Sequence, residues 1–237
     1  MTSVRSDAPA IRLADVRFGY RTGQLVLDVP ALEIARGERI FLYGPSGSGK
    51  TTLLGLLAGV LAGASGRIEV LGTDLARLGG AARDAFRAQH LGYIFQMFNL
   101  IPYLSVRDNI LLPTRLDAAR AARLGGQAPD AAVRELAEGL DIVALLDQPV
   151  TELSVGQQQR VAAARALIGH PELVVADEPT SALDADRREA FLRLLFASCE
   201  RAGATLVFVS HDQALAPLFS RRVSLPEINR AARPQAA

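Results

Sequence analysis

The chain has 237 residues, enough to bury a hydrophobic core without disulfides or structural metal ions, and its 26 basic and 25 acidic residues leave a formal charge of +1. This balance gives no electrostatic reason to expect a nucleic acid partner. A single cysteine excludes an internal disulfide, and because the sequence shows neither a secretory signal nor an apolar run of about 18 residues, we expect a cytoplasmic chain.

The N-terminal third predicts short strands and then a strand, a glycine-rich turn and a helix. Two β-like runs lie within residues 11–35, and the apolar run 39–43 leads to residues 51–61, which have helical length. Another short strand is expected over residues 67–72. The residues expected to interrupt the early strands are Gly23, Pro30 and Gly37.

The middle of the chain, from about residue 97 to 166, predicts a helical insertion. Between residues 130 and 147 apolar side chains recur at helical spacing, and Asp130 precedes them as the expected N-cap. These apolar residues are Val133, Leu136, Leu140 and Val143.

The C-terminal third predicts two parallel strands joined by a helix. The apolar runs 172–178 and 205–210 are typical of buried parallel strands. The helix between them should carry Phe191, Leu194 and Leu195 on one face and end at Gly203. The whole pattern therefore indicates an α/β fold with a mainly parallel sheet.

Residues 44–51, GPSGSGKT, match the phosphate-binding pattern G-x-x-x-x-G-K-[ST] between a predicted strand and a predicted helix. Lys50 is the only lysine among the 26 basic residues, and its compact ammonium suits a tight phosphate-binding loop better than a planar guanidinium. A chance lysine in a Gly/Ser-rich loop is the alternative. The residues expected to bind nucleotide phosphates are Gly44, Pro45, Ser46, Gly47, Ser48, Gly49, Lys50, Thr51 and Thr52.

Asp177 and Glu178 end the predicted strand LVVAD, at the edge of a parallel sheet where ligands bind. Asp177 is expected to hold Mg²⁺ and Glu178 to accept a proton from an attacking water. Alternatively, both carboxylates only solvate the strand end or cap the next helix.

Several longer motifs together resemble those of a known protein family. The runs LSVGQQQRVAAARAL (153–167) and LVVADEPTSALD (173–184), with FGY, FQ and SHD at residues 18, 95 and 210, resemble the motif series of ATP-binding-cassette ATPases over about residues 11–225. The resemblance implies a P-loop NTPase core with an N-terminal antiparallel β subdomain, both formed by 1–96 and 167–237. It also implies an inserted α-helical subdomain at 97–166 within a single cassette domain.

The resemblance assigns further roles by position. Tyr20 would stack on adenine, Gln96 would sense Mg²⁺ and the attacking water, and His211 would contact the γ-phosphate. Mg²⁺ would be held by Thr51, Gln96 and Asp177, and Asp184 would couple the two sites of a dimer. The signature loop, which would contact the ATP of another subunit, consists of Ser154, Val155, Gly156 and Gln157. Ser154 is also a possible helix N-cap.

Two positions depart from the family pattern. Val155 stands where the family usually has glycine, so we expect ATP-dependent pairing with slow hydrolysis. Pro226 follows the last predicted strand in place of the usual glycine-rich turn.

Residues 93–113 resemble the group that contains lipoprotein-release, macrolide-export and cell-division ATPases. This implies an ATP-bound homodimer on the inner face of the membrane, below a separate permease that docks near Gln96 to Tyr103. The apolar residues expected there, some of which must instead belong to the core, are Phe98, Leu100, Ile101 and Tyr103. The alternatives are an amino-acid-type importer ATPase, a cassette ATPase acting on DNA or ribosomes, and a P-loop kinase.

Overall fold

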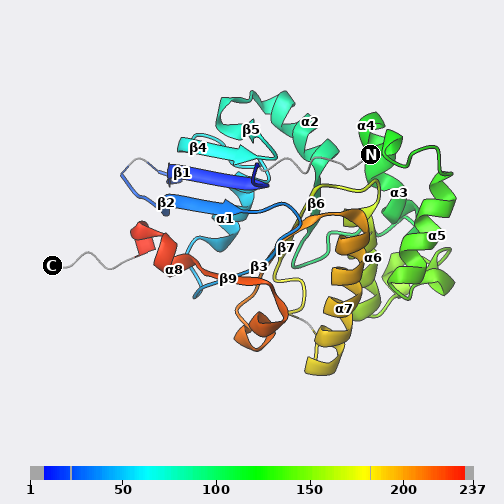
Figure 1. Ribbon diagram of the computed structural model, residues 1–237. Helices are drawn as coiled ribbons and strands as arrows, with labels where there is room; N and C mark the ends of the chain where they lie inside the picture. The colour runs from blue at the N-terminus through cyan, green and yellow to red at the C-terminus, as the bar shows by residue number, and fades with distance from the viewer. Residues whose placement is uncertain (1–7, 22, 182, 233–237) are drawn as a thin grey trace.

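Two sheets on either side of helix α1 organise the chain (Figure 1). The computed structural model describes residues 8–21, 23–181 and 183–232. The strands are β1 Ile11–Phe18, β2 Leu27–Ile34, β3 Arg39–Tyr43, β4 Ser65–Val70, β5 Thr73–Asp74, β6 Leu91–Ile94, β7 Leu173–Asp177, β8 Thr205–Val209 and β9 Arg221–Ser224. The α-helices are α1 Lys50–Leu57, α2 Gly80–His90, α3 Val106–Leu116, α4 Ala118–Ala122, α5 Pro129–Gly139, α6 Val155–Leu167, α7 Ala185–Ala202 and α8 Leu225–Ile228.

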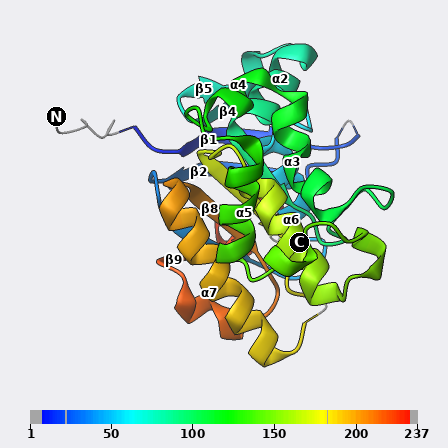
Figure 2. The same ribbon diagram turned by 90° about the vertical axis from the view of Figure 1, so that its right-hand side faces the viewer.

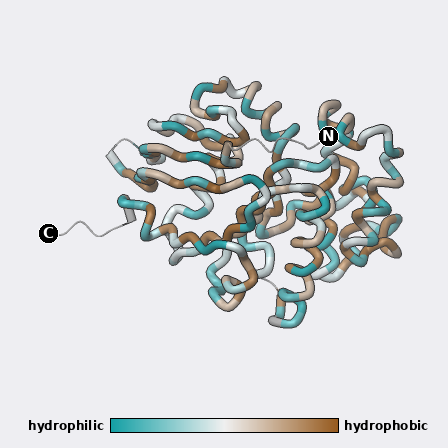
Figure 3. Tube along the Cα trace, viewed as in Figure 1, coloured by the Kyte–Doolittle hydropathy of each residue, from teal (hydrophilic) through white to brown (hydrophobic). Residues whose placement is uncertain are grey.

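The central sheet has five parallel strands in the order β6-β7-β8-β3-β9. Successive residues of a strand face opposite sides, and here both sides are covered. In β3, Phe41 joins the core cluster on the helical side, whereas Ile40 and Leu42 join the cluster beneath the antiparallel sheet. Apolar stretches, brown in Figure 3, accordingly run along the central strands. The predicted buried parallel strands are confirmed.

The second sheet is antiparallel, in the order β2-β1-β4-β5, and lies on the left in Figure 1. The sequence prediction that Pro30 interrupts its strand is wrong, because Pro30 lies within β2. Since β2 is an edge strand, one side of its backbone has no strand neighbour, and a proline is tolerated there.

The helices α3, α4, α5 and α6 form the opposite side of the molecule, onto which Figure 2 looks. The predicted helical insertion is therefore confirmed, but two details are wrong. Asp130 is not an N-cap, because α5 begins at Pro129 and the cap position is Ala128. Val143 lies in a short 3₁₀ turn after α5 and is 37% exposed. The boundaries assigned to the subdomains stay a prediction.

Helix α7 connects the adjacent parallel strands β7 and β8, as predicted. Phe191 and Leu195 are buried on its inner face, and Gly203 ends it in the left-handed conformation, with φ 65°. Helix α1 ends at Leu57, earlier than the expected residue 61, and Gly59 follows with φ 66°. A left-handed residue closes a helix end because it turns the chain away from the helical path.

Arg120 connects the helical side to the central sheet. Its side chain is 3% exposed, and its guanidinium donates to the carbonyls of Leu91 at 2.5 Å, Ala166 at 2.5 Å and Ile168 at 2.8 Å. Burial lowers the pKa of Arg120 to about 10, so the group stays charged at neutral pH. One side chain from α4 thus satisfies carbonyls after α2 and at the end of α6, which otherwise have no helical donor.

Replacing Arg120 should destabilise the fold, because Arg120→Met leaves several buried carbonyls without a donor. We expect the free energy of unfolding to fall by about 2–4 kcal/mol in urea titrations. The exposed Arg134 on α5 provides the control, and Arg134→Met should change the free energy by less than about 0.5 kcal/mol. Equal stability of the two variants would contradict the role assigned to Arg120.

Candidate active site

The glycine-rich turn between β3 and α1 forms the floor of the candidate site. Gly47 and Gly49 adopt φ 78° and 98°, conformations that glycine reaches without strain. Gly49 also lies close to β2, because a Cβ atom there would lie 2.8 Å from Leu27 Cδ2. The turn therefore leads into the N-terminus of α1, where backbone N–H groups and the helix dipole favour an anion.

The lone lysine closes this turn. Lys50 Nζ donates to the carbonyl oxygens of Gly44 at 2.8 Å and Pro45 at 3.0 Å, so the end of the turn is tied to its beginning. A phosphate oxygen offers the same ammonium a stronger, charge-assisted partner.

Two further pairs lie at the carboxyl ends of β7 and β8. Thr51 Oγ1 donates to Asp177 Oδ2 at 3.3 Å, and His211 Nδ1 lies 2.9 Å from Glu178 Oε2. Burial raises the pKa of Asp177, and the charge of Glu178 raises it further, while Thr51 and Lys50 lower it. Glu178 has a positive φ of 48°, a conformation that costs a non-glycine residue energy and that turns its side chain out of the strand.

Tyr20 joins the site from the antiparallel sheet. Its ring is 63% exposed and packs edge-on against Phe18, and its hydroxyl lies 3.0 Å from Thr52 Oγ1 in α1. A mostly exposed aromatic ring held beside a phosphate-binding turn can receive a flat heterocycle.

Gln96 follows β6, whose Ile94 pairs with Ala176 of β7. Its side chain is exposed, at the same sheet edge as Asp177. The structure thus brings four sequence-predicted regions to one edge: the glycine-rich turn, the end of β7, His211 and Gln96.

The signature loop does not join this group within one chain. Ser154 caps α6 and forms a capping box with Gln157, in which Gln157 N donates to Ser154 Oγ at 3.4 Å and Ser154 N donates to Gln157 Oε1 at 2.8 Å. Ser154, Gly156 and Gln157 line a separate hollow of about 320 Å³, and no residue of the glycine-rich turn borders it. Val155 is 46% exposed.

The sequence interpretation missed two polar residues of α6 that the tertiary structure connects to this edge. Gln159 is fully buried, and its Nε2 donates to the carbonyl of Pro179, next to Glu178, at 2.6 Å. Arg165 donates to the carbonyls of Phe98 and Asn99, both at 2.6 Å. Gln159 and Arg165 both lie within the motif 153–167, but only their burial in the folded structure distinguishes them from helix residues that face solvent.

Most of the chain is similar to proteins of known family. Residues 27–181 match the family model described as ABC transporter. The lipoprotein-releasing system ATP-binding protein LolD of Novosphingobium aromaticivorans is 39% identical over 226 residues, which cover 92% of this chain and 97% of LolD. The chain belongs to the ABC transporter family. It is an ATP-binding-cassette ATPase.

Two further relatives bear on the assembly of the cassette. The macrolide export ATP-binding/permease protein MacB 1 of Aeromonas hydrophila is 39% identical over 222 residues, which cover 92% of this chain and 33% of MacB 1. A solved dimeric structure of the cassette MJ0796 in a post-hydrolysis state, bound to ADP and Pi, has a TM-score of 0.80 at 29% identity and covers 95% of this chain and 97% of that chain. The predicted family and cassette fold are confirmed.

The residues of the cassette fit the divalent cation that the family implies. Thr51 and Asp177 supply a hydroxyl and a carboxylate, the hard oxygen donors that Mg²⁺ prefers, and few protein donors suffice because phosphate and water oxygens complete its shell. Among the described residues, no cluster of three or more His, Cys, Asp or Glu side chains offers another metal site. Nor does any helix in the described part of the chain have the length and apolar character to cross a bilayer.

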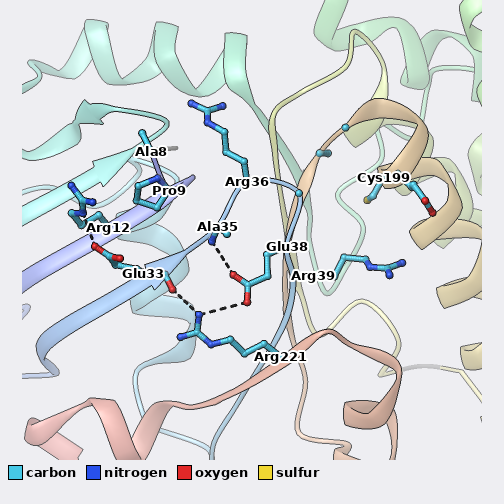
Figure 4. A pocket seen from close by; sticks show the side chains of 14 residues that line it. Ala8, Pro9, Arg12, Glu33, Ala35, Arg36, Glu38, Arg39, Cys199 and Arg221 are labelled. Carbon is cyan, nitrogen blue, oxygen red and sulfur yellow. Dashed lines mark hydrogen bonds and ion pairs between the residues drawn. The ribbon is translucent and has the colours of Figure 1, made fainter. Parts of the chain in front are cut away.

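A larger groove, of about 950 Å³, lies at the other end of the central strands (Figure 4). Arg39, the first residue of β3, lines this groove, whereas the glycine-rich turn follows Tyr43, the last residue of β3. Arg221 lies between Glu33 and Glu38, with its guanidinium 2.8 Å from the Glu33 carbonyl and 3.5 Å from the Glu38 carboxylate. The groove is therefore separate from the candidate nucleotide site.

The raised pKa of Asp177 gives a pH-dependent prediction. Since burial disfavours the carboxylate in the folded cassette, Asp177→Asn should stabilise the nucleotide-free protein at pH 8. The gain should be absent below the unfolded pKa of about 3.9, grow as the pH rises from there to the raised folded pKa, and stay constant above it. Urea unfolding in EDTA at several pH values measures this.

The exposed Asp186 in the first turn of α7 is the matched control. Asp186→Asn should show no such rise. A lower stability of Asp177→Asn than of the wild type at pH 8 would contradict the assigned effect of burial.

Proposed function

We propose that two copies of the cassette pair head to tail around two ATP molecules and use their hydrolysis to act on a separate membrane permease. The observation that carries this proposal is the separation of the signature loop from the glycine-rich turn in one chain. A second copy can supply the missing loop, and the dimeric MJ0796 structure shows that a similar cassette does pair. Permease-fused MacB 1 supports a membrane partner.

In this dimer each residue of the site has a defined role. Lys50 and the backbone N–H groups of residues 44–52, apart from Pro45, which has none, hold the phosphates, and Tyr20 stacks on adenine. Thr51, Gln96 and Asp177 would hold Mg²⁺, which would neutralise phosphate charge. Glu178 accepts a proton from water as the water oxygen attacks the γ-phosphorus and the bond to the bridging oxygen breaks. His211, 2.9 Å from Glu178, orients that carboxylate and contacts the γ-phosphate.

The docking surface for the permease needs one correction. Phe98 is only 8% exposed and belongs to the core, and Leu100 packs against that core. The exposed apolar side chains of this region are Phe95 at 38%, Met97 at 81% and Tyr103 at 85%. We place the docking surface on these three, with Ile101 at its border. It would lie on the inner face of the cell membrane.

The similarity to LolD and MacB 1 favours export of lipoproteins, peptides or drugs over solute import. The alternative of a cassette acting on DNA or ribosomes finds no supporting observation in this structure. The effect of Val155 on hydrolysis stays a prediction, and its 46% exposure leaves its side chain available to a second copy.

The role of Glu178 has a direct test. Glu178→Gln should bind ATP but lower turnover at least about 100-fold, because the proton acceptor is lost. The variant should therefore accumulate as a closed dimer with Mg²⁺ and ATP in size-exclusion chromatography. Lys50→Ala is the control, since it loses the phosphate contact and should stay monomeric. Wild-type turnover of Glu178→Gln would remove Glu178 as the base.

The permease partner is tested by affinity purification of Glu178→Gln protein with ATP from detergent-solubilised host membranes, followed by mass spectrometry. We expect an integral membrane protein at about equal stoichiometry. Adding Met97→Glu and Tyr103→Glu should abolish its recovery, whereas Val60→Glu, at a position 61% exposed after α1, should not. Recovery of ribosomal or DNA-repair proteins without a membrane protein would overturn the transport function.

A further inference from the structure

The last described segment of the chain, residues 225–232, packs behind the glycine-rich turn. Strand β9 runs parallel to β3, and Ser224 pairs with Tyr43, so both strands end at the same edge of the sheet. The segment after β9 therefore begins beside Gly44. Its first residue, Leu225, is fully buried.

Pro226 contacts the start of the turn directly. A Cβ atom at Gly44 would lie 3.0 Å from Pro226 Cδ and 2.7 Å from Ser48 Oγ, so only glycine fits between them. The proline that departs from the family pattern is thus part of the wall against which the turn is packed.

Asn229 makes the decisive contact. Its side chain is fully buried, and its amide uses all four of its hydrogen-bonding positions. Oδ1 accepts from the N–H groups of Asp28 at 2.8 Å and Ala231 at 3.1 Å. Nδ2 donates to the carbonyls of Val26 at 2.9 Å and Ser48 at 3.1 Å. One amide therefore joins the free edge of β2 to the glycine-rich turn.

The contact with Ser48 sets the direction of a phosphate-binding group. In a trans peptide the C=O and the following N–H point in opposite directions. Because the Ser48 carbonyl points at Asn229, the N–H of Gly49 points away from Asn229. Gly49 has φ 98° and immediately precedes Lys50, so a change in this peptide plane would also displace the lysine.

We propose that Asn229 is a positioning residue for nucleotide binding, which orients the Ser48–Gly49 peptide and preorganises the turn for the phosphates of ATP. The inference rests on the proposed function of residues 44–52 and adds a residue from the opposite end of the sequence. It predicts a loss of ATP affinity, with little change in the rate at saturating ATP, because Asn229 is not placed to touch the reacting atoms.

Asn109 offers a matched control. It is also fully buried, and its amide accepts from Ile101 N and donates to the carbonyls of Ile101, Leu104 and Ser105. These bonds lie in the helical region and do not involve the glycine-rich turn. Asn109→Leu and Asn229→Leu thus remove the same amide from equally buried positions.

The experiment measures the Kd of the full chain for MgATP by calorimetry, with urea titrations to confirm that each variant is folded. Asn229→Leu should raise the Kd about tenfold, equal to about 1.4 kcal/mol, while Asn109→Leu stays within about twofold of the wild type. If Asn229→Leu does not fold, Asn229→Asp replaces it in the experiment. The aspartate keeps the acceptor oxygen but loses the donors to Val26 and Ser48. It should show the same increase.

The outcomes separate this inference from the proposed function. If the wild type binds ATP and folded Asn229 variants bind it equally well, the inference alone is wrong. An equal loss of affinity in Asn109→Leu would reduce Asn229 to a general stabilising residue and also overturn it. If the wild type itself fails to bind MgATP, the proposed function falls, and the inference with it.

Discussion

The parallel alignment of β3, β7 and β8 is the constraint on which the rest of the structure depends. Parallel neighbours end at the same edge, so residues that follow different strands meet there although they lie far apart in sequence. Lys50 follows β3, Glu178 follows β7 and His211 follows β8. Burial of both faces of this sheet keeps the strands in register and leaves their ends as the place where polar side chains gather.

Helix α6 connects this edge to the remainder of the cassette. Its N-terminus carries the capping box of Ser154, its buried Gln159 holds the carbonyl after Glu178, and its Arg165 holds the carbonyls after Met97. At the C-terminal end of α6, the guanidinium of Arg120 donates to the carbonyl oxygen of Ala166. This helix with its attachments links the loop proposed to contact a second copy, the proposed base and the proposed docking surface of the same chain.

Most elements were predictable because their signals are local. The glycine-rich turn, the apolar parallel strands and the glycine that ends α7 each follow from a short pattern. The errors also have local causes. Pro30 looks like an interruption, since a sequence does not show that its strand lies at an edge. Asp130 fits the pattern of an N-cap, and the sequence does not show that Pro129 takes the first helical position instead. The sequence leaves Phe98 open between docking surface and core, and only the packing of the helices decides that it belongs to the core.

By itself, the sequence determined the family and predicted the phosphate-binding turn and the roles of Asp177 and Glu178, because short motifs contain the residues expected to contact nucleotide. Only the tertiary structure decided which residues support the glycine-rich turn. Asn229 and Gly49 are separated by most of the chain, and a single asparagine in a polar tail has no pattern that marks it. Its importance comes from complete burial beside four backbone groups, and such a surrounding exists only after β2, β3 and β9 have assembled.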